Sequence, residues 1–152
     1  MRDNVISKNA KKHLFRGDSL GGAVAANIAS RTQPAALILE STFRTTREVA
    51  KEMFPYLPVS LFIHEDYNTP EKLSQMTIPL LVIHSSEDEI IPFQQGKSLY
   101  DEYSGPKHFL RIHGSHNTGF LESAREYRKT LQQFLENVPV DTANFFTPQS
   151  NN

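Results

Sequence analysis

The chain has 152 residues, of which 38% are hydrophobic and 22% charged, and its formal net charge is −1. This length allows one domain with a core of its own, and the balanced charge gives no footprint for nucleic acid or an anionic membrane surface. The sequence contains no cysteine, which excludes disulfides, thiolate metal sites and cysteine nucleophiles.

The first residues, "MRDNVISKNAKKHLF", lack the apolar stretch of a secretory signal, and no window approaches 18 apolar residues. From the sequence as given we therefore expect a soluble protein without a membrane segment. A cytoplasmic location is favoured.

Short apolar runs alternate with segments of helical spacing along the chain. We predict strands at 13–15, 35–39, 79–83 and 108–112, and helices at 20–30, 45–54, 70–75, 93–103 and 121–138. Strands that alternate with helices at this pitch predict a parallel sheet covered on both faces. Residues 139–152 lack periodicity, and we predict a flexible tail there.

The segment "FRGDSLGG", residues 15–22, follows the first predicted strand and opens the first helix. Gly17, Ser19 and Gly21 fit G-x-S-x-G, the nucleophile elbow of α/β-hydrolases, in which a serine hydroxyl is exposed on a strained turn. The positions two before and two after the serine crowd the same space and need small residues, here Gly17 and Gly21. The backbone N–H of Leu20, at the start of the helix, is the predicted oxyanion-hole donor.

The same letters spell two other motifs. The GDSL lipases carry their acid and base as Asp-x-x-His, and this chain contains no such tetrapeptide. An RGD adhesion ligand requires exposure on a mobile loop of a secreted protein, whereas here it would join a strand to a helix. We set both interpretations aside.

An acid and a base follow in the order that an α/β-hydrolase requires. Asp88 lies in the loop after the strand at 79–83, and His116 lies in the loop after the strand at 108–112. The carboxyl ends of parallel strands meet at one edge of the sheet, so these side chains and Ser19 would converge. The alternatives are that Asp88 is one of three solvated loop acids, with Glu87 and Glu89, and that His113 competes with His116.

The other four histidines look structural or merely exposed, and they lack the spacing of metal ligands; they are His13, His64, His84 and His108. We predict no metal and no cofactor.

Five segments, "LFRGDSLGGAVAANIAS", "ALILESTF", "IPLLVIHSSEDEIIP", "LYDEY" and "GSHN", resemble the C-terminal half of the family of α/β-hydrolase domain-containing protein 13 and its serine-aminopeptidase-like relatives. The resemblance implies Ser19 as nucleophile, Asp88 as acid and His116 as base. It implies an α/β class and a partial α/β-hydrolase domain over residues 1–138, with about four parallel strands, equivalent to strands five to eight, and flanking helices.

The sequence departs from this family in two respects. Asp18 stands where the family has a basic residue, and the elbow comes so early that the first four strands and the second oxyanion donor have no counterpart. The elbow strand would then form an exposed edge, so we expect a truncated hydrolase that self-associates through it.

Two functions are therefore open. One is a serine hydrolase of reduced activity that acts on a small-molecule ester, thioester or amide. The other is a non-catalytic fragment or pseudoenzyme that self-associates or binds a partner through the edge strand. The aromatic segment at 54–67 could line an acyl pocket, but we interpret it as ordinary packing.

Overall fold

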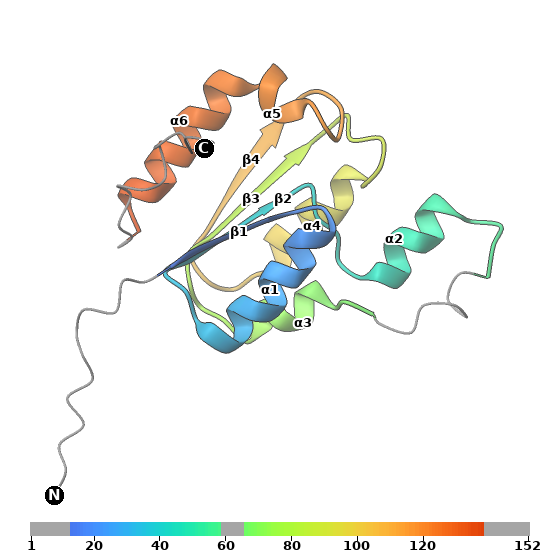
Figure 1. Cartoon of the computed structure of the whole chain (residues 1–152), viewed down its shortest axis with the longest axis horizontal. Coiled ribbons are helices and arrows are strands. Elements are labelled where there is room, and N and C mark those ends of the chain that lie inside the picture. Colours follow the sequence, from blue (N-terminus) through green and yellow to red (C-terminus); the bar gives the residue numbers. More distant parts are fainter. Residues whose placement is uncertain (1–12, 59–65, 139–152) are drawn as a thin grey trace, which may run out of the picture.

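The computed structural model describes residues 13–58 and 66–138. Its centre is a sheet of four parallel strands in the order β1-β2-β3-β4 (Figure 1). The strands are β1 (Leu14–Asp18), β2 (Ala36–Glu40), β3 (Leu80–Ser85) and β4 (Lys107–Ile112). The four predicted strands and their parallel arrangement are confirmed.

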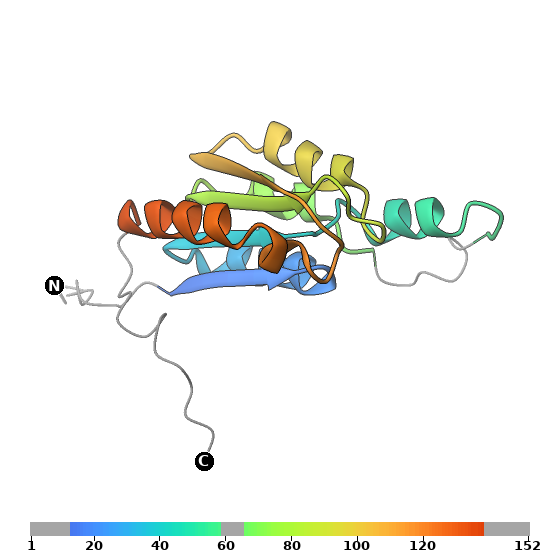
Figure 2. The ribbon, with the colours of Figure 1, turned by 90° about the horizontal axis from the view of Figure 1, so that it is seen from above.

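The described ranges contain six helices (Figures 1 and 2). They are α1 (Leu20–Thr32), α2 (Thr46–Met53), α3 (Thr69–Ser74), α4 (Phe93–Glu102), α5 (Gly119–Glu122) and α6 (Ala124–Glu136). The helix predicted at 121–138 is in fact a short α5 followed by α6, with a break at Ser123.

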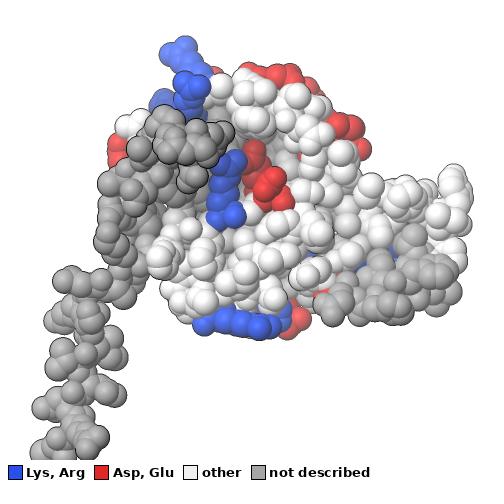
Figure 3. Space-filling view, in the orientation of Figure 1, with Lys and Arg blue, Asp and Glu red and all other residues white. Residues whose placement is uncertain are grey.

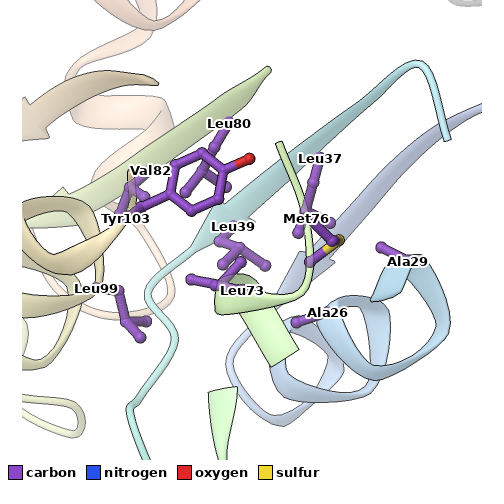
Figure 4. Packing of buried hydrophobic residues seen from close by; sticks show 10 residues of the cluster. All are labelled: Ala26, Ala29, Leu37, Leu39, Leu73, Met76, Leu80, Val82, Leu99 and Tyr103. Atoms are coloured by element: carbon purple, nitrogen blue, oxygen red, sulfur yellow. The ribbon is translucent and has the colours of Figure 1, made fainter. Parts of the chain in front are cut away.

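The two central strands are buried along their whole length. Successive side chains alternate between the two faces: Leu37 and Leu39 pack with helices α1, α3 and α4, whereas Ile38 packs with Tyr127 of helix α6. Figure 4 shows the first of these clusters, in which residues from α1, the end of α3 and α4 approach the sheet. Apolar side chains on both faces of a strand are what a helix-covered parallel sheet requires.

Helix α1 lies close to the sheet because its buried face carries only small residues, namely Gly22, Ala23, Ala26 and Ala29. This close approach fixes the start of the helix directly after β1. It therefore also fixes the position of Ser19 between the two elements.

Some predictions fall on other parts of the chain. The predicted tail at 139–152, His64 and residues 59–65 of the aromatic segment at 54–67 lie outside the described residues. Within that segment, Phe54, Tyr56 and Leu57 are exposed. The interpretation of these three side chains as ordinary packing is therefore wrong. Among the helices of the described ranges, none is long and apolar enough to cross a membrane.

Candidate active site

The loops that carry the three predicted triad residues lie at the carboxyl ends of their strands. Ser19 follows β1, Asp88 lies three residues beyond β3, and His116 lies four residues beyond β4. Because all strands are parallel, these loops share one edge of the sheet. Strand topology thus places residues that are far apart in the sequence at one edge of the sheet.

Ser19 has a strained backbone, with φ of 50° and ψ of −125°. Three hydrogen bonds hold it there: its N–H donates to the Glu40 carbonyl at 2.9 Å, and its carbonyl accepts from the Thr42 hydroxyl at 2.6 Å and from the Gly22 N–H at 3.1 Å. A non-glycine residue at positive φ is costly and persists only where its surroundings enforce it. Strain of this kind is typical of functional positions.

The glycines around Ser19 are under different steric constraints. A Cβ on Gly17 would lie 2.3 Å from the Gly21 carbonyl oxygen, so Gly17 is required. A Cβ on Gly21 would lie 3.8 Å from its nearest neighbour, an oxygen of Asp18, which is an ordinary contact. The predicted crowding at Gly21 is therefore wrong. It occurs instead at Gly22, whose Cβ would lie 2.4 Å from Thr42 Oγ1.

Leu20 is the first residue of α1. The N–H groups in the first turn of a helix have no intrahelical acceptor, and the helix dipole there favours negative charge. The main chain of Leu20 can therefore serve as the oxyanion donor that the sequence predicts.

The Asp88 side chain has no exposed surface. Its Oδ1 accepts backbone hydrogen bonds from Ile90 at 2.9 Å and Ile91 at 2.7 Å, and its Oδ2 lies 2.7 Å from His116 Nδ1. Burial raises the pKa of Asp88, but the contact with His84 and these hydrogen bonds outweigh it and hold that pKa well below its usual range. Asp88 is a fixed, ionised acceptor.

His116 has a side chain that is 10% exposed. Because an ionised carboxylate can only accept, Nδ1 carries the proton in the contact with Asp88, and Nε2 is then the nitrogen that can take up a proton. Within residues 13–58 and 66–138, no hydrogen bond joins Ser19 Oγ to His116. Such bonds are often long in a site without substrate.

The two glutamates beside Asp88 bind the loop of His116. Glu89 Oε2 accepts from the backbone N–H of His116 at 3.0 Å, and Glu87 Oε2 accepts from that of Gly114 at 3.0 Å. Glu87 Oε1 also lies 3.2 Å from His113 Nδ1. The interpretation of these acids as merely solvated is therefore wrong, and His113 has a partner that the sequence did not indicate.

Two buried residues of this region were not predicted. Thr42 anchors the Ser19 carbonyl, and His84 lies against Asp88 with its Nε2 3.5 Å from Oδ2. The sequence does contain a sign of this role for His84. It is a polar residue at the end of an apolar strand, four positions before the acid. His13 and His108 are exposed, as predicted.

A hollow of about 140 Å³ adjoins His116. Its lining residues are Arg16, Asp18, Glu40, Ser41, His116, Asn117 and Phe120. Arg16 donates to Glu40 at 2.8 Å, and the Tyr127 hydroxyl donates to the same carboxylate at 2.6 Å. Asp18, where the resembled family has a basic residue, thus lies beside Arg16. Figure 3 shows a recess beside helix α6 in which basic and acidic side chains meet.

A larger cavity of about 550 Å³ lies between α3, α4 and the start of α2, and none of the three triad residues lines it. Across the described ranges, no group of three or more histidine, aspartate or glutamate side chains could hold a metal ion.

Comparisons with known proteins bear on the fold of the chain. No protein-family model matches the sequence. An esterase from Pyrococcus furiosus superimposes on 85% of the chain, which covers 55% of that structure, with a TM-score of 0.67 and 17% identity. The chain has a partial α/β-hydrolase fold.

Sequence relatives extend this result. An uncharacterized protein of Mycobacterium tuberculosis is 32% identical over 127 residues, which are 83% of this chain and 45% of the relative. The human α/β-hydrolase domain-containing protein 17B is 32% identical over 129 residues, which are 84% and 43% of the two chains. The chain spans less than half the length of these relatives. The name of the human relative describes an α/β-hydrolase domain in that protein, and the narrower resemblance to domain-containing protein 13 stays a prediction.

Proposed function

We propose that this chain carries the nucleophile, acid and base of a serine hydrolase that acts on an ester, a thioester or a small amide. The observation that carries the proposal is the 2.7 Å contact between His116 Nδ1 and the buried Asp88 Oδ2. The same edge of the sheet holds Ser19 in a strained conformation.

The reaction would follow the scheme of such triads. His116 Nε2 takes the proton of the Ser19 hydroxyl as Oγ attacks the substrate carbonyl carbon. Asp88 stabilises the imidazolium, and the Leu20 N–H donates to the oxyanion. Collapse breaks the bond to the leaving group, which takes the proton from His116. Water then releases the acyl group from Ser19 by the same steps.

The proposed rate depends on the number of oxyanion donors. The loss of one donor typically costs about 10²–10³ in rate. If Leu20 supplies the only donor that acts in this chain, we expect turnover to be slower than in a complete site by about that factor.

Labelling with a fluorophosphonate probe tests the nucleophile. We expect the wild-type chain to be labelled and Ser19→Ala to be unlabelled, because the probe bonds to the activated hydroxyl. Ser104→Ala is the matched control, since Ser104 is an exposed serine outside the site. Equal labelling of Ser19→Ala and the wild type would contradict the proposal.

The alternative is a non-catalytic fragment or pseudoenzyme. It is favoured by the lack of a Ser19–His116 hydrogen bond in the described part of the chain and by the position of β1 at the end of the sheet order. A wild-type chain that is folded by circular dichroism and takes up no probe would support this alternative.

A further inference from the structure

His84, the fifth residue of β3, is completely buried. A buried imidazole is costly unless its nitrogens find partners. Its Nε2 lies 2.9 Å from the Ile91 carbonyl oxygen and 3.5 Å from Asp88 Oδ2. The ring thus faces the loop that carries the proposed catalytic acid.

The partners of the ring determine its tautomer. A carbonyl oxygen only accepts, so Nε2 must carry a proton. Nδ1 is buried without a hydrogen-bond partner, and a Cβ on Gly96 of helix α4 would lie 2.2 Å from it. Protonated Nδ1 would be a buried donor with no acceptor, which favours the neutral ring with its proton on Nε2.

The Nε2–H reaches Asp88 by two routes. The direct route is the longer contact to Oδ2, the oxygen that also contacts His116. The indirect route passes through Ile91, whose carbonyl accepts from His84 and whose N–H donates to Asp88 Oδ1 at 2.7 Å. Movement of His84 would therefore disturb one contact at each oxygen of the carboxylate, and the contacts with Ile90 and His116 would remain.

We propose that His84 is a positioning residue for Asp88. His84 fixes the turn at residues 88–91 and thereby the position of the carboxylate oxygen that contacts His116. The proposal rests on the function proposed above, in which Asp88 is the acid of the triad.

Few other charges surround the ring. On β4, the register partner of His84 is Arg111, whose guanidinium lies 5.6 Å from the centroid of the Phe93 ring. Phe93 meets His84 edge-on, with centroids 6.0 Å apart. Helix α4 presents the uncharged Gly96, and the base loop presents His116 through Asp88. The substitutions below change none of these groups.

Two variants of similar length separate the hydrogen bond from the packing. His84→Gln keeps a donor near the position of Nε2, and His84→Met does not. Removing a donor from a carboxylate makes its protonation easier. We therefore expect the Asp88 carboxyl carbon, followed by NMR as pH falls, to begin titrating about half a pH unit or more higher in His84→Met than in His84→Gln.

The catalytic rate is a second measurement, independent of the Asp88 titration. With an ester substrate, we expect kcat to be about tenfold lower in His84→Met than in His84→Gln with KM unchanged, because a displaced acid misaligns the base. His108→Met, at an exposed histidine of β4, is the control and should match the wild type. Equal Asp88 titration in the Gln and Met variants would overturn the proposal.

The wild-type chain provides a test that does not depend on the folding of a variant. Imidazole ¹⁵N shifts should show the proton of His84 on Nε2, and a proton on Nδ1 would overturn the proposal. If Ser19 takes up no probe but the Asp88 titration still separates Met from Gln, the catalytic function fails and the positioning role of His84 stands.

Discussion

At the scale of single residues, the two adjacent glycines at the start of α1 should respond in opposite ways to the same substitution. In Gly22→Ala the new Cβ would overlap Thr42 Oγ1 and disturb its bond to the Ser19 carbonyl. Overpacking of this kind costs about 1–3 kcal/mol of the free energy of unfolding. In Gly21→Ala there is room for the Cβ, and alanine favours the helix by up to about 1 kcal/mol.

Urea unfolding followed by circular dichroism measures both changes. We expect the midpoint of Gly22→Ala to lie below that of the wild type and the midpoint of Gly21→Ala to lie at or above it. The opposite order would show that the crowding is at Gly21, as the sequence motif alone predicts.

Residues whose role follows from chain order were easier to predict than residues whose role follows from contact. Ser19, Asp88 and His116 could be proposed from the strand that precedes each of them. Thr42 meets Ser19 only after β1 and β2 are paired, and His84 meets Asp88 and Ile91 only after the loop at 88–91 folds back on β3. Apart from the position of a polar residue at the end of an apolar strand, nothing in the sequence indicates these contacts.

At the scale of elements, the acid loop and the base loop are joined by a contact that depends on pH. The carboxylate of Glu87 accepts a hydrogen bond from the Gly114 N–H and contacts His113, and these two contacts lower the pKa of Glu87. Since the pKa is lowered in the folded state, the contact is present above the ordinary glutamate pKa of about 4.3 and is lost as pH falls through the lowered value.

The Gly114 amide resonance reports this contact. We expect its chemical shift to change as pH falls below about 4.3, and we expect this change to be absent in Glu87→Gln. Glu126→Gln, at an exposed glutamate of α6, is the control and should titrate like the wild type. A Gly114 shift that still titrates in Glu87→Gln would show that another group is responsible.

The elements themselves show which sequence patterns are reliable. The buried strands β2 and β3 were predicted within two residues at each end because both of their faces are apolar. The break between α5 and α6 was missed because it depends on Ser123, whose hydroxyl accepts from the His113 N–H at 2.9 Å. That contact comes from a distant loop, and helical periodicity across 121–138 does not reveal it.

At the scale of the whole molecule, the two outer strands of the sheet differ in what protects them. Strand β4 carries Lys107, His108 and Arg111, and charged side chains are a common protection of sheet edges. On β1, the His13 carbonyl and the Ser19 N–H point toward β2, since both bond to the stretch from Ala35 to Glu40. Because bonding direction alternates along a strand, the N–H of Arg16 points away from β2.

Self-association through β1 therefore has a specific test. Arg16→Pro and Arg16→Ala both remove the ion pair with Glu40, but only proline also removes the N–H at the free edge. Under the edge-pairing hypothesis, light scattering after size exclusion should show concentration-dependent dimers or larger species for the wild type and Arg16→Ala. Arg16→Pro should stay monomeric, because a second strand cannot pair with an edge that lacks this donor. A wild-type chain that is monomeric at high concentration, or equal association of the two variants, would contradict pairing through β1.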